Sequence, residues 1–310
     1  MVAEFEHVSV LLTEAVDALS IVPEGVYVDG TFGRGGHSRL ILEKLGPEGR
    51  LLAIDRDQAA EDVAVTEFGR DARFRFYRGS YIEMEQCVAL AAVSKVNGVL
   101  LDLGVSSPQL DDASRGFSFL KEGPLDMRMD QSSGVTAAQW LASAPEAEIA
   151  DVLWTYGEEK FSRRMAKAIV ERRSVEPILR TTQLATIVAD ANPRWEKGKH
   201  PATRAFQAIR IHINQELDQI PATLERAFGL LAKGGYLVVI SFHSLEDRLV
   251  KQFMKSKSEP IKAPKGLPVP DDWSSVQGRV VKKKIRASAE ELEHNARARS
   301  AVMRVLEKTV

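Results

Sequence analysis

The chain has 310 residues, of which 44% are hydrophobic and 27% charged, which is typical of a folded globular protein and not of a disordered or fibrous one. Its net charge of −1 argues against a protein wrapped in nucleic acid, although basic residues can still gather on one face. A single cysteine excludes an internal disulfide and a cysteine-based zinc site, and no apolar run reaches the roughly 20 residues that span a bilayer. These features predict a cytoplasmic enzyme with no membrane segment.

Short apolar segments alternate with segments of helical periodicity in the N-terminal third. Asp29, Asp55 and Asp102 each follow one of the apolar segments and should lie at the carboxyl edge of a sheet, where ligands bind in open α/β folds. The alternation predicts a parallel sheet with helices on both faces. The expected strands lie near 26–28, 51–54, 74–77 and 99–101, and the expected helices near 9–19, 37–45, 57–68 and 83–94.

The first expected strand runs into a turn that contains Gly33, Gly35 and Gly36. A dinucleotide-binding turn needs glycine at three spaced positions, but Ser38 occupies the third. Asp29 directly precedes the turn, where its charge would repel a pyrophosphate and suit the ammonium group of a methionine moiety. Asp55 is placed to accept the hydroxyls of a ribose. S-adenosyl-L-methionine therefore fits better than NAD, and an NAD-dependent oxidoreductase is the first alternative.

The alternation stops after Asp102, and residues 111–205 show helical patterns without a convincing strand. We expect this block to be an inserted helical subdomain that recognises the substrate. The α/β domain is then discontinuous and consists of residues 1–110 and 206–310.

The α/β pattern resumes with a long helix, predicted from Thr203 to about Leu231, and a buried strand at 233–241. Two further strands are expected at 278–285 and 301–306. Five parallel strands followed by an antiparallel pair form the mostly parallel, seven-stranded sheet of Rossmann-like methyltransferases that use S-adenosylmethionine.

Two segments that follow strands carry side chains suited to amine chemistry. After the fourth strand, Asp102, Ser107 and the carbonyl groups of Ser107 and Pro108 can accept hydrogens from an exocyclic amine. The alternative is an ordinary Ser-Ser-Pro turn. After the fifth strand, Phe242 can stack on a base and His243 can handle a proton.

Ser244 is the next residue and, with Asp247, is expected to cap a helix at 245–253. Facing the active-site edge, Ser244 is also a candidate for substrate binding. Capping accounts for Ser244 and Asp247 without any function.

A basic segment, residues 192–214, leads into the helix that begins near Thr203. Lys199, Arg204, Arg210 and Asn214 are its candidate substrate-binding residues, with contacts to RNA phosphates. The alternative for Arg210 and Asn214 is a structural one, in which they bond to neighbouring loops. The histidines show no metal-ligand spacing, and no metal is expected.

Seven motifs occur in order over nearly the whole chain and resemble the MraW/RsmH family, the bacterial small-subunit ribosomal RNA (cytosine-N4)-methyltransferases. The motifs are His7-Val-Ser-Val-Leu-Leu12, Asp29-Gly-Thr-Phe-Gly-Arg-Gly-Gly-His-Ser38, Asp102-Leu-Gly-Val-Ser-Ser-Pro-Gln-Leu-Asp111, Arg115-Gly-Phe-Ser-Phe119, Leu125-Asp-Met-Arg-Met129, Ala202-Thr-Arg-Ala-Phe-Gln-Ala-Ile-Arg210 and Ser241-Phe-His-Ser-Leu-Glu-Asp-Arg248.

The resemblance implies N4 methylation of a cytidine in the decoding centre of 16S ribosomal RNA, with S-adenosyl-L-methionine as donor. It also implies residue roles: Gly35, Gly36 and His37 along the methionine part, Asp55 at the ribose, Tyr81 near the adenine, and Asp102 and Gln109 as further contacts. The roles of Tyr81 and Gln109 rest mainly on the resemblance.

The sequence is also compatible with two different RNA or DNA functions. One is that of a non-catalytic RNA-binding assembly factor of the small ribosomal subunit. The second is that of a DNA amino-methyltransferase, which would differ in its response to the 2′-hydroxyl. The oligomeric state, monomer or homodimer, and the final proton acceptor are likewise open.

Overall fold

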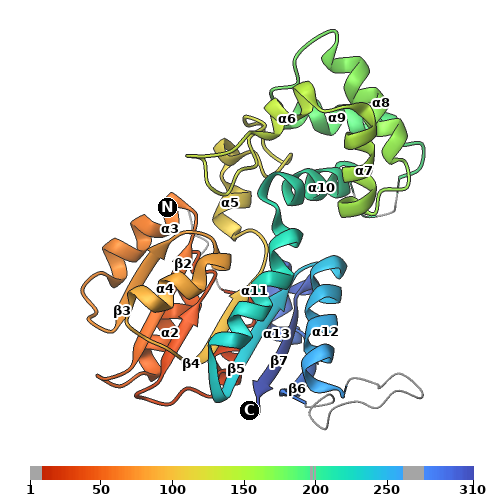
Figure 1. Cartoon of the computed structure of the whole chain (residues 1–310). Helices are drawn as coiled ribbons and strands as arrows, with labels where there is room; N and C mark the ends of the chain where they lie inside the picture. Colours follow the sequence, from red (N-terminus) through yellow and green to blue (C-terminus); the bar gives the residue numbers. More distant parts are fainter. Residues whose placement is uncertain (1–8, 196–197, 199, 261–275) are drawn as a thin grey trace, which may run out of the picture. The chain divides into compact units, whose positions relative to one another are not determined.

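The computed structural model describes residues 9–195, 198, 200–260 and 276–310. The chain divides into two compact units (Figure 1). The α/β unit contains the residues up to Gly104 and from Leu217 to Val310, and the helical unit contains Val105–Glu216. Across the described ranges, no helix is both long and apolar enough to cross a membrane.

A seven-stranded sheet forms the centre of the α/β unit, with the strand order β3-β2-β1-β4-β5-β7-β6. Strands β1 to β5 pair in parallel, and β7 runs antiparallel to both β5 and β6. This topology confirms the predicted fold class. The strands are β1 (Val26–Asp29), β2 (Arg50–Asp55), β3 (Phe74–Arg78), β4 (Val96–Asp102), β5 (Leu231–Ser241), β6 (Gly278–Ile285) and β7 (Val302–Lys308).

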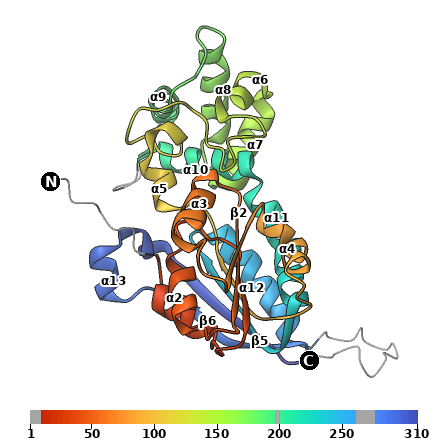
Figure 2. The ribbon, with the colours of Figure 1, turned by 90° about the vertical axis from the view of Figure 1, so that its left-hand side faces the viewer.

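Helices cover both faces of the sheet because successive strand residues point to opposite sides. Leu51 and Ala53 pack with α1, α2 and α3, whereas Leu52 and Ile54 pack in a second cluster with α4, α11 and α12. Figure 2 shows α2 on one side of the strands and α4 and α11 on the other. The single cysteine, Cys87, is buried in the second cluster. The helices are α1 (Leu12–Ala18), α2 (Gly36–Lys44), α3 (Gln58–Val63), α4 (Met84–Leu90), α11 (Glu216–Leu230), α12 (Ser244–Ser258) and α13 (Ala289–His294).

The helical unit has a hydrophobic core of its own. Leu153 of α7, Met165 and Ile169 of α8, Leu184 of α9 and Ile209 of α10 are all fully buried in it. A self-contained core of this kind is what an inserted domain requires. Its helices are α5 (Ser107–Asp111), α6 (Ala137–Ser143), α7 (Glu146–Gly157), α8 (Ser162–Arg173), α9 (Thr181–Ala191) and α10 (Ala202–Asn214).

The prediction of one helix from Thr203 to about Leu231 is wrong, because the chain forms two helices there, α10 and α11. Gln215 lies between them with φ +52°, a left-handed conformation that ends α10. The helical unit also extends beyond 111–205 at both ends. Val105 and Leu110 pack against its core, and the apolar face of α10 is part of that core.

Candidate active site at the carboxyl end of the sheet

The glycine turn leaves β1 and leads directly into α2. Gly35 is the residue before α2 and has φ +75°, and a Cβ atom there would lie 2.6 Å from the ring of Phe68, so only glycine fits. The amide of Gly33 donates a 2.8 Å hydrogen bond to Oδ2 of Asp55 at the end of β2. The turn is therefore fastened to the neighbouring strand.

Asp29 ends β1 beneath this turn and is 1% exposed. Its carboxylate accepts hydrogen bonds from the Ser38 hydroxyl at 2.7 Å and from the Thr31 amide at 3.1 Å. Burial raises the pKa of Asp29 to about 6, against the lowering effect of these two donors. The site thus contains a carboxyl group that a positively charged ligand would keep ionised.

Asp102 ends β4, and the pairing of β1 with β4 places it at the same sheet edge as Asp29. Its Oδ1 atom is buried and accepts no hydrogen bond from any described residue. Burial raises the pKa of Asp102 well above its ordinary value, and the negative charges of Asp29 and Glu246 raise it further. A buried carboxylate oxygen without a donor is costly, so this arrangement favours a ligand that brings a positive charge or a hydrogen-bond donor.

Asp55 completes the row of aspartates at the carboxyl edge. Besides the Gly33 amide, it accepts a 2.9 Å hydrogen bond from the amide of Asp57, and burial raises its pKa. Tyr81 lies in the turn after β3, where its Cβ is 3.5 Å from the position that a Cβ of Gly30 would occupy. The structure therefore brings Tyr81 beside the start of the glycine turn. Its role at the adenine stays a prediction.

Gly36 and His37 lie on another side of the turn. A Cβ at Gly36 would collide with the Ser9 hydroxyl, and Nε2 of the buried His37 ring is 3.2 Å from the carbonyl oxygen of Val10. Both residues therefore contact the segment that precedes α1. That these positions also line the methionine part stays a prediction.

His243 and Glu246 close the loop after β5. His243 is the residue that caps α12, and Oε1 of Glu246 lies 3.0 Å from its Nε2. Oε2 of the buried Glu246 accepts the amide of Phe242 at 2.8 Å. The expected cap by Ser244 and Asp247 is wrong by one residue, because His243 and Glu246 form the capping box. Asp247 instead forms two hydrogen bonds with Arg304 of β7, at 2.7 and 2.9 Å.

Sequence reasoning missed Glu246 as a functional candidate. The signal was present, since a glutamate three residues after a capping residue commonly binds back to the cap. Glu246 contributes to the raised pKa of Asp102, so it belongs to the electrostatics of the site.

The residues that follow β4 belong to the helical unit. Ser107 and Pro108 form the first turn of α5, and the buried Gln109 accepts the amide of Ser106 at 2.9 Å through its side-chain oxygen. Gln109 therefore helps to cap α5. Pro108 lies in the first turn of α5, a position that proline favours, so the structural interpretation of the Ser-Ser-Pro turn remains open beside the catalytic one.

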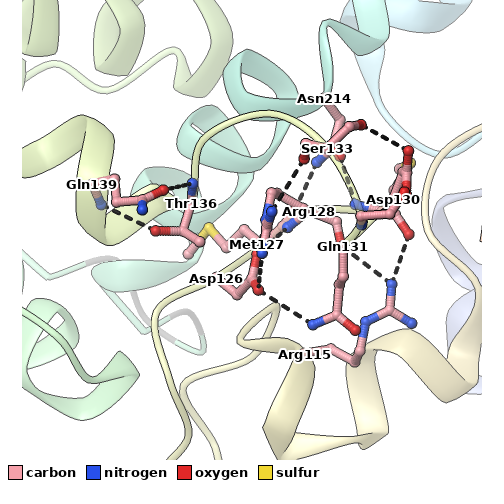
Figure 3. Close-up of polar contacts among 12 residues, drawn as sticks. Arg115, Asp126, Met127, Arg128, Asp130, Gln131, Ser133, Thr136, Gln139 and Asn214 are labelled. Carbon is pink, nitrogen blue, oxygen red and sulfur yellow. Dashed lines mark hydrogen bonds and ion pairs between the residues drawn. The ribbon is translucent and has the colours of Figure 1, made fainter.

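Arg210 and Asn214 make contacts within the fold, as their structural interpretation expects. Arg210 forms two hydrogen bonds with Glu216, at 2.9 and 3.0 Å. The buried amide of Asn214 donates to the carbonyl of Met127 and accepts the amide of Met129, both at 2.8 Å (Figure 3). Asn214 thereby fixes the loop that carries one of the seven motifs.

The remaining candidates are Arg204, Phe242, Ser244 and Lys199. Arg204 lines a pocket near the start of α10, and Phe242 and Ser244 flank His243. Lys199 lies outside the described residues. Within the part of the chain that the structure describes, no group of three or more His, Cys, Asp or Glu side chains is suited to hold a metal ion.

The strand order and the carboxylates at the sheet edge define a Rossmann-like methyltransferase that uses S-adenosyl-L-methionine. The unpaired Oδ1 of Asp102 fits this cofactor, because its methionine part carries an ammonium donor and a sulfonium charge. The chain belongs to the MraW methylase family, whose sequence profile matches residues 4–309. This confirms the resemblance stated from the motifs and excludes the NAD-dependent oxidoreductase.

Curated relatives match the chain almost from end to end. A protein named ribosomal RNA small subunit methyltransferase H from Thioalkalivibrio sulfidiphilus is 57% identical over 304 residues, which cover 97% of each chain. Proteins of the same name from Chromohalobacter salexigens and Shewanella halifaxensis are 56% and 55% identical, and the matches cover 99% of this chain and 92% and 98% of theirs.

Proposed function

We propose that the protein transfers a methyl group from S-adenosyl-L-methionine to N4 of a cytidine in the decoding centre of 16S ribosomal RNA, in the cytoplasm. The observation that carries the proposal is the buried, unpaired carboxylate oxygen of Asp102 at the sheet edge, close enough to Asp29 and Glu246 for their charges to raise its pKa. The names of the relatives, which specify ribosomal RNA of the small subunit, support the choice of substrate.

The cofactor supplies an electrophilic methyl group on a positively charged sulfur. Gly35, Gly36 and His37 would line its methionine part, with Asp29 at the ammonium group and Gly33 as a further contact. Asp55 would bind the ribose and Tyr81 the adenine, and the positions of Asp29, Gly33 and Asp55 around the turn support this. Orientation of the acceptor amine beside that methyl group would supply much of the acceleration.

The cytosine amine is a poor nucleophile because its lone pair is delocalised into the ring. The predicted acceptors of its hydrogens are Asp102, the Ser107 hydroxyl and the carbonyl groups of Ser107 and Pro108, which would favour tetrahedral geometry at nitrogen. When the N–C bond forms and the S–C bond breaks, the nitrogen must lose one proton. The raised pKa of Asp102 makes its carboxylate a stronger base than an ordinary one and thus a candidate acceptor.

Labelled methyl donor incubated with small ribosomal subunits from a strain that lacks this gene tests the proposal. We expect one label per subunit, at N4 of a cytidine in the 16S RNA. A parallel reaction with protein-free 16S RNA identifies the form of the substrate. RNA binding without any label would favour the non-catalytic assembly factor, and label on another atom would contradict the proposal.

Ser107→Ala tests the amine-acceptor role. Loss of one hydrogen-bond acceptor that acts in the transition state should slow single-turnover methyl transfer by about 100-fold. The dissociation constant for the cofactor should stay unchanged, as measured by calorimetry. Full methylation at the wild-type rate would remove Ser107 from the mechanism.

A further inference from the structure

A pocket of about 140 Å³ lies within the helical unit and is separate from the residues assigned to the cofactor. Three stretches of chain line it: the segment just before α8, the segment after α9, and the start of α10 with the residues before it. Lys160, Arg194 and Arg204 bring three positive charges to its wall, and Glu159 is the carboxylate among its lining residues. We call this site, with these four residues, the basic pocket.

The negative charge of Glu159 is engaged by the fold. Its side chain is 3% exposed, and its Oε1 accepts the amide of Phe161 at 3.0 Å, just before α8 begins. Among the described lining residues the basic side chains outnumber the carboxylate, so this part of the wall is positive. Thr203 and Arg204 of the first turn of α10 also line the pocket, and the free amide groups of a helix N-terminus add positive partial charge.

Lys160 and Arg194 differ from several basic side chains of this unit. Arg128 forms an ion pair with Asp126 at 2.7 Å, and Arg210 forms one with Glu216 at 2.9 Å, so contacts within the fold neutralise both charges. Neither Lys160 nor Arg194 forms an ion pair with any residue in the described ranges. Two cations on one pocket wall that pair with none of the described residues are suited to an external anion.

Aromatic rings continue the surface beside the pocket. Trp195 is 60% exposed, and its ring centroid lies 5.6 Å from that of His200, which in turn lies 4.7 Å from Phe119. Nδ1 of His200 accepts the amide of Ala202 at 3.1 Å, so the neutral ring carries its proton on Nε2 and can donate it to a ligand. An exposed indole next to basic side chains is the combination that binds single-stranded nucleic acid.

We infer that the basic pocket and Trp195 bind single-stranded RNA that flanks the target cytidine, with a backbone phosphate between Lys160 and Arg194 and a base stacked on Trp195. This inference rests on the proposed function, since it assigns part of the same RNA substrate to this surface. Arg204 lies on the same wall, which gives this candidate residue a specific place in RNA binding.

The phosphate contact is tested by the double variant Lys160→Gln and Arg194→Gln in the full-length protein. The measurement is fluorescence anisotropy of a labelled, short single-stranded RNA with a central cytidine, over a range of salt concentrations. Each lost phosphate contact lowers the slope of log K against log salt by about 0.7 for a single strand. Because both side chains contact the same phosphate, we expect the double variant to lower the slope by about 0.7.

A matched control removes two charges elsewhere in the same unit. Lys167→Gln and Arg172→Gln lie on α8 but do not line the pocket, and both residues already face glutamates, Glu171 and Glu176. We expect the control to keep the wild-type slope. If both double variants lower the slope equally, only the overall charge matters and the inference is overturned.

Stacking is tested by Trp195→Ala, with Trp154→Ala as the control. Trp154 is also exposed, at 59%, but it lies on α7 and does not line the pocket. Trp195→Ala removes one stacking contact with a base and should weaken RNA binding about tenfold. The control should bind RNA with the wild-type affinity. Equal affinities of the two tryptophan variants would rule out stacking on Trp195.

Methyl transfer to the small subunit, measured on the same proteins, separates the two proposals. If the wild type methylates cytidine and the pocket variants bind RNA normally, the inference fails alone. If the wild type methylates no cytidine while the pocket variants lose RNA binding, the proposed function fails and the pocket remains an RNA site.

Discussion

At the scale of single residues, the aspartates of the sheet edge determine the electrostatics of the site. Asp29, Asp55 and Asp102 were predictable because the ends of parallel strands meet at one edge. The raised pKa values were not, because they depend on burial and on Glu246, whose side chain turns back into the loop after β5. The contacts of His37 could not be predicted from the sequence either, since they depend on how the segment before α1 packs.

The pKa of Asp29 has a consequence for stability. A carboxyl group with a pKa of about 6 when folded and 3.8 when unfolded stabilises the fold at low pH, and this contribution is lost as the pH rises through 6. Asp29→Asn lacks this titration. We expect the unfolding free energy of the wild type, relative to the variant, to fall by about 2 kcal/mol between pH 4 and pH 7. Denaturant unfolding of both proteins without cofactor measures it, and a constant difference would contradict it.

Asp55→Ala should weaken binding of S-adenosyl-L-homocysteine by about ten- to 100-fold, because a charged acceptor of hydrogen bonds is lost. The same change releases the Gly33 amide and loosens the glycine turn. Asp62→Ala removes one negative charge from the exposed side of α3 and is the matched control. Calorimetry measures both, and an unchanged dissociation constant for Asp55→Ala would remove the ribose assignment.

At the scale of elements, the strands and most helices agree with the predictions because apolar periodicity dominates them. The break between α10 and α11 was missed, since glutamine is not a usual residue for the left-handed conformation that Gln215 adopts. The cap of α12 was missed because serine is the stronger capping residue, yet His243 takes the position and Glu246 completes the box.

Asn214, at the end of α10, holds a loop whose residue Met127 has φ +64°. Asn214→Ala would leave the carbonyl of Met127 and the amide of Met129 without partners, at a cost of about 2–4 kcal/mol. We expect faster amide exchange in the loop and lower stability of the helical unit. Gln207→Ala on the same helix removes only a 3.5 Å contact to Tyr156 and should have little effect. Equal exchange rates in both variants would show that Asn214 does not fix the loop.

At the scale of the whole molecule, the chain builds separate cores in its two units. One cluster lies entirely in the helical unit, and two others flank the sheet. The two units were predictable from the loss of alternation after Asp102, but their boundaries were not. Those boundaries depend on tertiary packing, as when α10 contributes its apolar face to the helical core.

Separate cores predict a local response to ligand. S-adenosyl-L-homocysteine at 100 times its dissociation constant should stabilise the unit that binds it by about 2.7 kcal/mol. In hydrogen exchange we expect protection of the glycine turn and of the ends of β1, β2 and β4. Helices α7 to α9 should exchange as in the free protein. Uniform protection of both units would contradict this.

The buried position of Cys87 makes the protein suitable for site-specific fluorescent labelling at engineered cysteines. Burial raises the pKa of this thiol to about 11, so at neutral pH almost none of it is the thiolate that reacts with maleimides. Because the native chain contains no second thiol, one dye attached to an engineered surface cysteine in each unit would report their separation by energy transfer while RNA is bound and released.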